Sequence, residues 1–175
     1  SSERAARELQ IPRSFPTWPA LVASPDIDAV VIGTWPYLHC PVTLAALDAG
    51  KHVMTEARMA MNAAEARLML EASRRKPHLV TQVVPSPYTL KIDRTVQKLL
   101  ADGFVGELQA LDVRANAPSF LDRGSPLHWR HDRDLSGVNI LGMGIWYEAV
   151  MRWVGEAKTV KAMTRVSVKQ RKHFN

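Results

Sequence analysis

The chain has 175 residues, of which 46% are hydrophobic and 23% charged, a balance that indicates a globular protein and excludes a disordered or membrane-spanning one. Its single cysteine, Cys40, excludes an intramolecular disulfide, and no Cys/His spacing resembles a zinc site, so we expect a cytoplasmic protein without a metal. The formal net charge of +6 is concentrated at residues 74–76 and 169–172, where no aromatic residues alternate with the basic ones, so we expect no nucleic-acid partner.

Residues 28–61 predict one complete strand–helix–strand unit, around which the rest of the chain is organised. The unbroken apolar run at residues 29–32 is typical of a strand covered on both faces. Pro41 suits the first turn of a helix, and Gly50 suits the left-handed residue that ends one. A second strand follows at residues 52–56, so we expect two parallel strands joined by a right-handed crossover.

Ligands in parallel sheets bind at the carboxyl ends of the strands. In this unit those ends are residues 33–39 and residues 56–58. The sequence therefore predicts two ligand-facing tips, one after each strand.

The neighbouring segments continue the same pattern. Short helices are expected within residues 1–10 and 17–24, before the first strand. After the second strand, Asn62 has the position of a helix cap, with a glutamate three residues later as in a capping box, and the helix it begins ends before Pro77. A third strand is expected at residues 79–84.

The strongest boundary signal is the Pro-Ser-Pro sequence at residues 85–87, because each proline interrupts regular pairing. We therefore expect one domain at residues 1–84 and a second at residues 85–175. The segments predicted in the second are a helix at residues 92–103, a strand at 107–114, a long irregular stretch at 116–138, a helix at 140–154 and a strand at 159–168. The last strand alternates apolar and polar residues, which is typical of an open sheet.

The order and spacing of several motifs resemble one known family. The motifs are DAVVIGTWPYLH, ALDAGKHVMTEA, ADGFVGEL, HWR and SGVNILGMGIW, which together extend over nearly the whole chain. They resemble the glucose-fructose oxidoreductase, inositol dehydrogenase and rhizopine-catabolism (Gfo/Idh/MocA) family. The resemblance implies an α/β fold in which part of a Rossmann-like parallel sheet is followed by the start of an α+β domain with an open, mostly antiparallel sheet.

The same resemblance implies the cofactor and the partners. We expect NAD or NADP, a small-molecule substrate, and a homo-oligomer formed through the open sheet. The glycine-rich loop that approaches the pyrophosphate in this family has no counterpart, since no G-x-G-x-x-G occurs. The chain also begins with Ser1 rather than Met, so we expect a fragment or a processed product.

The resemblance also assigns cofactor-binding residues to the two tips. These are Thr34, Trp35, Pro36, His39, Glu56 and Arg58. Other interpretations remain open: the residues after the first strand could plug the sheet, Glu56 could face only solvent, and Arg58 could form a surface salt bridge instead of binding an anion.

Three family positions differ in this chain. The family reads Glu-Lys-Pro where this chain has Glu56-Ala57-Arg58, and its substrate-contacting Asp and His correspond here to Gly142 and Trp146. A replacement proton carrier would then come first from His128 or Tyr147, with Tyr88, Lys91 and His131 as further candidates. Trp129, Arg130 and Trp146 are the expected substrate-binding residues.

These observations favour an NAD(P)-dependent oxidoreductase with an atypical catalytic site that acts on a sugar, a polyol or a related small molecule. The alternative is a catalytically inactive homologue that keeps the fold for binding or association. A third hypothesis keeps the pocket for a lyase or hydrolase reaction.

Overall fold

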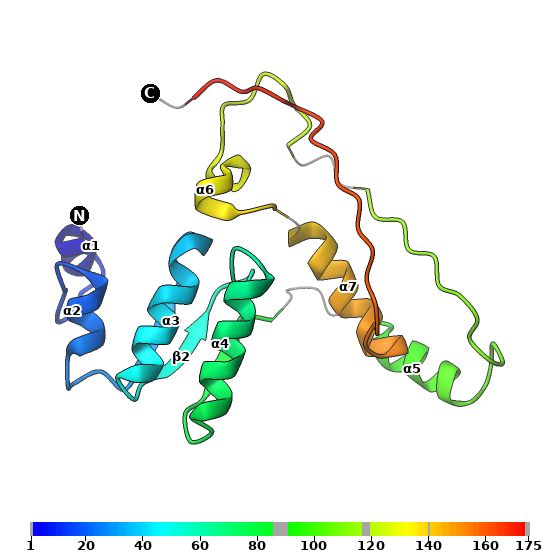
Figure 1. The fold of residues 1–175 in the computed structure, drawn as a ribbon, viewed down its shortest axis with the longest axis horizontal. Helices are drawn as coiled ribbons and strands as arrows, with labels where there is room; N and C mark the ends of the chain where they lie inside the picture. The colour runs from blue at the N-terminus through cyan, green and yellow to red at the C-terminus, as the bar shows by residue number, and fades with distance from the viewer. Residues whose placement is uncertain (1, 86–90, 117–119, 140, 174–175) are drawn as a thin grey trace. The chain divides into compact units, whose positions relative to one another are not determined.

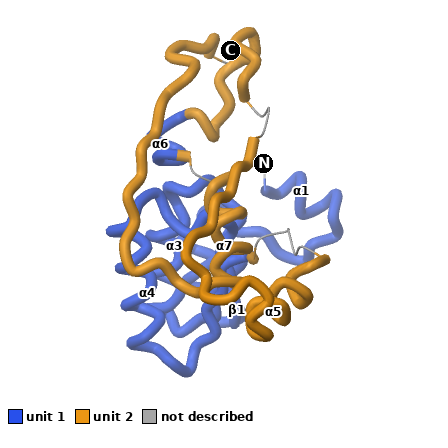
Figure 2. Tube along the Cα trace, turned by 90° about the vertical axis from the view of Figure 1, so that its right-hand side faces the viewer, with its two compact units in different colours: residues 1–84, 132–138 blue, residues 85–131, 139–175 orange. Residues whose placement is uncertain are grey.

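The computed structural model describes residues 2–85, 91–116, 120–139 and 141–173. The chain divides into two compact units, shown in blue and orange in Figure 2. The first unit contains residues 1–84 and 132–138, and the second contains residues 85–131 and 139–175. Within the described residues, no helix has the length and apolar character needed to cross a membrane.

The first unit is built on a parallel sheet of three strands in the order β1-β2-β3. The strands are β1 (Ala29–Ile32), β2 (His52–Thr55) and β3 (Thr81–Val83). Val53 in the central strand pairs with Val30 on one side and Thr81 on the other. The predicted parallel strand–helix–strand unit and the third strand are therefore confirmed.

Two helices connect the strands and lie beside β2 in Figure 1: α3 (His39–Asp48) and α4 (Ala63–Arg75). Asn62 caps α4 by accepting a hydrogen bond from the Glu65 backbone N–H at 3.0 Å, which confirms the predicted cap. The Glu65 carboxylate accepts from the Met61 backbone N–H at 2.9 Å rather than from the cap residue. The glutamate thus secures the chain one residue earlier than a standard capping box does.

A continuous apolar core holds the helices on one face of the sheet. Its buried members are Val22, Val30, Ile32, Val42, Ala46, Leu47, Val53 and Ala72. On β1 the burial alternates, because Val30 and Ile32 face this core whereas Val31 is 72% exposed. The prediction that β1 is covered on both faces is therefore wrong for the described residues. An apolar run specifies a strand, but it does not specify what packs on either face.

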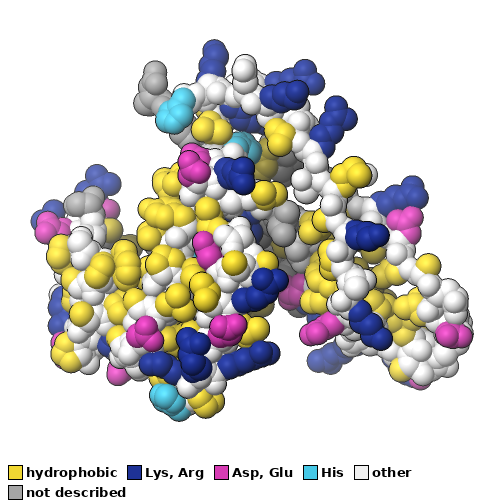
Figure 3. Space-filling model, in the orientation of Figure 1, with side chains coloured by type: hydrophobic (Ala, Val, Ile, Leu, Met, Phe, Trp, Pro, Cys, Tyr) yellow, Lys and Arg dark blue, Asp and Glu magenta, His cyan; other side chains and the backbone are white. Residues whose placement is uncertain are grey.

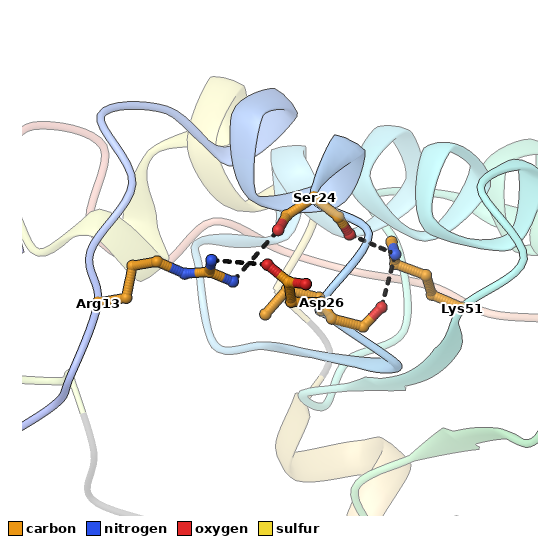
Figure 4. Close-up of polar contacts among 5 residues, drawn as sticks. Arg13, Ser24, Asp26 and Lys51 are labelled. Atoms are coloured by element: carbon orange, nitrogen blue, oxygen red, sulfur yellow. Dashed lines mark hydrogen bonds and ion pairs between the residues drawn. The ribbon is translucent and has the colours of Figure 1, made fainter.

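Two short helices precede the sheet, α1 (Ser2–Glu8) and α2 (Trp18–Ala23). Figure 4 shows how the turn between α2 and β1 is held. The buried Lys51 ammonium donates to the carbonyl oxygens of Ser24 at 2.8 Å and Ile27 at 2.6 Å. Arg13 donates to the Asp26 carboxylate at 2.8 Å. These contacts lie before the amino ends of the strands, away from the predicted tips.

The second unit consists of helices and extended segments. The helices are α5 (Asp93–Ala101), the 3₁₀ helix η2 (Trp129–His131) and α7 (Leu141–Val154). The Asp93 carboxylate joins α5 to α7, since it accepts from the Trp153 indole N–H at 2.8 Å and lies 3.2 Å from the Arg152 guanidinium. Both long helices of this region are confirmed, although Ile140, the expected first residue of the second, lies outside the described residues.

The strands expected at residues 107–114 and 159–168 are not formed in the described residues, and Figure 1 draws both segments as coil. The expected open, mostly antiparallel sheet is likewise not seen there. Alternating apolar residues favour an extended backbone, but a strand also requires a neighbour that accepts and donates ladder hydrogen bonds. Here Val160 is 72% exposed and Met163 is 98% exposed. The homo-oligomer expected through that sheet stays a prediction.

Candidate functional site

The two tips follow β1 and β2 at the same edge of the sheet. β1 and β2 are parallel and in register, with Ile32 beside Thr55, so the chain leaves both strands at neighbouring points. After β1 it turns through residues 33–35 into the 3₁₀ helix η1 (Pro36–Leu38) and then into α3. After β2 it runs through Glu56 to Arg58, across a cis Ala57–Arg58 peptide bond.

Several of the predicted cofactor-binding side chains are accessible at this edge. Thr34 and Glu56 are exposed, and Trp35 is 44% exposed. The Thr34 hydroxyl donates to the Trp35 carbonyl oxygen at 3.2 Å, and the Glu56 carboxylate accepts from the Ala57 N–H at 3.2 Å. Pro36, the next residue, is buried. The two tips therefore expose a hydroxyl, an indole and a carboxylate.

The His39 side chain contacts the backbone of both tips. Its side chain is 1% exposed at the start of α3. Nδ1 lies 2.8 Å from the Arg58 carbonyl oxygen, and Nε2 lies 2.9 Å from the Thr34 carbonyl oxygen. Both ring nitrogens therefore contact the protein's own backbone.

The side chain of Arg58 holds a segment that is distant in sequence. Its guanidinium donates to the Ser136 hydroxyl at 2.7 Å and to the Val138 carbonyl oxygen at 2.9 Å. Gly137, at φ +61°, lies so close to the backbone that a Cβ there would be 2.5 Å from the Met61 carbonyl oxygen. Only glycine fits this position, so residues 132–138 are seated closely against the second tip.

Ser136 and Val138 are the contacts that sequence reasoning missed, because residues 116–138 were expected to be irregular throughout. The structure instead forms the short helix α6 (Arg133–Ser136), which packs next to η1. Asp132 caps it by accepting from the Asp134 N–H at 2.9 Å, and Gly137 ends it. The Asp cap followed by a glycine five residues later was the signal that could have located this helix.

Cys40 provides no nucleophile at this edge. The thiol is buried, and burial raises its pKa, with a further rise from the nearby Glu65 carboxylate. It packs with Ala60 and Met69. Cys40 thus behaves as a small buried hydrophobic residue.

In the second unit, α7 borders an open apolar cavity of about 530 Å³. Gly142, Trp146 and Tyr147 line it from the helix, and Leu111 and Val113 line it from the extended segment. The structure thus brings two candidate residues, Trp146 and Tyr147, to one cavity although they lie about 100° apart around the helix. His128 is not among the residues that line it.

His128, Trp129 and Arg130 lie instead in and beside η2. The Arg130 guanidinium stacks on the Trp129 ring, 4.0 Å from its centre, and the Trp129 and His128 rings lie 5.4 Å apart. His131 accepts a hydrogen bond from the His128 backbone N–H at 3.2 Å. Burial lowers the pKa of His131, and the charges of Arg171 and His128 lower it further.

Arg171 organises the loop beside η2. Its guanidinium donates to the carbonyl oxygen of Asp122 at 2.6 Å, and it also contacts the Phe120 carbonyl oxygen and Ser125. The Phe120 ring in turn meets His131 edge-on at 4.4 Å. Among the described residues, no group of His, Cys, Asp and Glu could hold a metal ion. Tyr88, a further proton-carrier candidate, lies outside the described residues.

Comparison with known proteins identifies the same family along both units. Residues 1–83 match the family described as "Oxidoreductase family, NAD-binding Rossmann fold", and residues 94–174 match the "GFO/IDH/MocA C-terminal domain".

Curated and solved relatives agree with this match. Levoglucosan dehydrogenase of Pseudarthrobacter phenanthrenivorans is 28% identical over 79% of this chain and 35% of its own length. D-xylose 1-dehydrogenase (NADP(+)) of Hypocrea jecorina is 30% identical over 83% of this chain and 40% of its own. The crystal structure of an NAD binding oxidoreductase from Klebsiella pneumoniae superimposes with a TM-score of 0.66 at 27% identity, over 88% of this chain and 41% of that one. The chain thus spans about two fifths of the relatives it matches, and it belongs to the Gfo/Idh/MocA oxidoreductase family.

Proposed function

We propose that the protein acts as an NAD(P)-dependent oxidoreductase on a hydroxyl-bearing small molecule of the sugar or polyol class. The observation that carries this proposal is the pair of tips at the carboxyl edge of β1 and β2, which is where parallel sheets bind nucleotides. Membership of the family supports the redox chemistry. The names of two relatives, levoglucosan dehydrogenase and D-xylose 1-dehydrogenase (NADP(+)), support a carbohydrate substrate and a nicotinamide cofactor.

The side chains at the tips suit a dinucleotide. Glu56 is an exposed carboxylate that can accept hydrogen bonds from ribose hydroxyls, and Thr34 can donate or accept one. The Trp35 indole offers a flat face for stacking beside the buried Pro36. When bound, the cofactor would supply the hydride acceptor or donor, and these residues would orient it.

Residues of the second unit would contact the substrate. Trp146 can donate one hydrogen bond and stack against the carbon skeleton of a sugar, but an indole cannot exchange a proton at neutral pH. Trp129 and Arg130 are proposed as further substrate-binding residues. Their cation–π stack presents a guanidinium, which forms forked hydrogen bonds to oxygen-rich molecules.

Proton transfer would fall to His128 or Tyr147. The lysine, aspartate and histidine that the family resemblance leads one to expect correspond to Ala57, Gly142 and Trp146. We therefore propose an atypical reaction centre. Tyr147 lines the apolar cavity beside Trp146, where the two could contact one substrate.

Cofactor binding is tested with the full-length protein by titrating NADH and NADPH while recording tryptophan fluorescence. We expect saturable quenching with at least one of them, weakened several-fold by Glu56→Gln because ribose hydroxyls lose a charged acceptor. Glu71→Gln, an exposed glutamate on α4, is the matched control and should bind like the wild type. No saturable change with either nucleotide would overturn the proposal.

Turnover is tested separately by following the reduced cofactor with a panel of aldoses and polyols. The pair Ala57→Lys and Trp146→His should raise the rate if the reaction centre was weakened at these positions. If the wild type and the double variant both bind the cofactor but neither turns over any substrate, the inactive homologue is favoured.

A further inference from the structure

Within the candidate site, the position of His39 indicates a structural role rather than contact with a ligand. It lies at the first position of α3 and is 1% exposed. Its two ring nitrogens lie 2.8 Å and 2.9 Å from the carbonyl oxygens of Arg58 and Thr34. One of these residues belongs to the tip after β2 and the other to the tip after β1.

The two carbonyl oxygens determine how many N–H groups the His39 ring needs. Carbonyl oxygens only accept hydrogen bonds, whereas a neutral imidazole has one N–H and one bare nitrogen. A bare nitrogen facing a carbonyl oxygen would bring two lone pairs together. Donation to both carbonyl oxygens therefore requires an N–H at each ring nitrogen, as in the imidazolium form.

The bridge also reaches the segment that covers the second tip. Arg58 is held by its carbonyl oxygen to His39 and by its guanidinium to Ser136 and Val138. His39 therefore lies at the centre of a chain of contacts from Thr34 through Arg58 to residues 132–138, all within the first unit. A shift of the ring would move the tips and the anchor of this segment together.

We propose that His39 is a positioning residue for the dinucleotide site: it donates one hydrogen bond from each ring nitrogen and so sets the spacing between the two tips. It acts through Thr34 and Arg58 and does not itself touch the cofactor. The effect on cofactor affinity rests on the proposed function, whereas the double donation stands without it.

The double donation is tested by nuclear magnetic resonance of the full chain with ¹⁵N-labelled histidine. We expect one imidazole with two hydrogen-bonded N–H groups, and both signals should disappear in His39→Gln. In Ser136→Ala, which removes only an acceptor of Arg58, they should remain. A His39 ring with a single N–H and one bare nitrogen would overturn the proposal.

The positioning role is tested by nucleotide affinity. A glutamine amide can donate toward one carbonyl oxygen but cannot replace a rigid ring that donates in both directions. We expect His39→Gln and His39→Ala to raise the Kd for NADPH or NADH about tenfold, at a temperature where circular dichroism shows the variants folded. His78→Gln, at an exposed position after α4, should stay close to wild type.

These readouts separate the two proposals. If the wild type binds neither nucleotide, the proposed function fails while the ring signals still decide the double donation. If the wild type binds and folded His39→Gln binds equally well, the positioning role fails while the oxidoreductase proposal stands. A variant with a lower Tm and an unchanged Kd would show a purely structural role and would likewise overturn the positioning role.

Discussion

The two units are stabilised by different kinds of interaction. All buried hydrophobic residues within the described part of the chain belong to the first unit, except Ala149 on α7. Exposed apolar side chains occur in both units, for example Val31 at 72% in the first and Phe104 at 74% in the second, so only the buried core distinguishes them. Apolar side chains are visible as yellow surface in Figure 3. The first unit therefore rests mainly on apolar burial, and the second on a few polar contacts.

The difference shows what a paired sheet contributes. Three hydrogen-bonded strands provide a surface on which α3 and α4 bury one face each, so the core forms from local elements. In the second unit, no paired strand is formed in the described residues. Polar contacts join α5 to α7: Asp93 contacts Trp153 and Arg152, and the Gln97 amide donates to the Arg152 carbonyl oxygen at 2.9 Å.

The largest effect is expected for Leu47→Ala in the core of the first unit. Leu47 is 0% exposed, so its truncation removes buried surface and leaves a cavity, which typically costs about 2–5 kcal/mol of unfolding free energy. The measurement is urea denaturation followed by far-ultraviolet circular dichroism. Leu68→Ala on α4, at 51% exposure, is the control and should cost well under half as much. Equal losses would show that burial of Leu47 in this core is not a main source of the stability of the first unit.

Asp93→Ala tests whether polar contacts hold the second unit. The substitution leaves the Trp153 indole and the Arg152 guanidinium without their shared acceptor, and we expect a loss of about 1–3 kcal/mol. Trp153 lies at the contact, so its fluorescence in a urea titration reports the change. Lys98→Ala breaks only the exposed pair with Asp102 and should cost about 0–1 kcal/mol. A smaller effect for Asp93→Ala than for this control would contradict the view that the Asp93 contacts stabilise the second unit.

Asn62→Ala tests the local contribution to the first unit. The cap hydrogen bond to Glu65 is lost, and we expect about 1 kcal/mol of destabilisation in the same urea experiment. Asn62→Asp keeps an oxygen acceptor at this position and should lie within a few tenths of a kcal/mol of the wild type. If both variants lose the same amount, the cap is not the source of the stability.

The smallest effect is the pH dependence that His131 gives to the second unit. Burial, then Arg171 and His128, lower the pKa of this imidazole below its ordinary value of 6.5. The unfolded chain then binds more protons than the folded one, so folding stability falls as the pH drops through 6.5. The thermal midpoint of the wild type should therefore fall more on acidification than that of His131→Asn. The exposed His78→Asn variant should keep the wild-type slope.

Local patterns predicted most of the helices and the parallel sheet. The apolar run of β1, the Asn62 cap and the periodicity of α5 and α7 depend on neighbours within a few residues, which is the range that sequence patterns describe. The same patterns also predicted two strands in the second unit that the described residues do not form. Alternation describes which side chains share a face, but pairing depends on a distant segment.

The candidate site shows the same limit. The positions of the two tips followed from the strand ends, whereas the contacts that join them did not. Arg58 was predicted at the second tip, but its partner Ser136 lies 78 residues away in a segment expected to be irregular. His39 was predicted as a cofactor-binding residue, and its burial against two backbone carbonyl oxygens became apparent only in the folded chain.

The sequence by itself determined the α/β character of the first unit, the edge of the sheet at which the two tips lie and the family resemblance. These depend on side-chain periodicity, helix caps and the order of motifs along the chain. The tertiary structure alone decided that His39 bridges the tips, that Arg58 anchors residues 132–138 and that one face of β1 stays exposed. Each of these depends on hydrogen bonds or packing between segments far apart in sequence, which no local pattern of residues encodes.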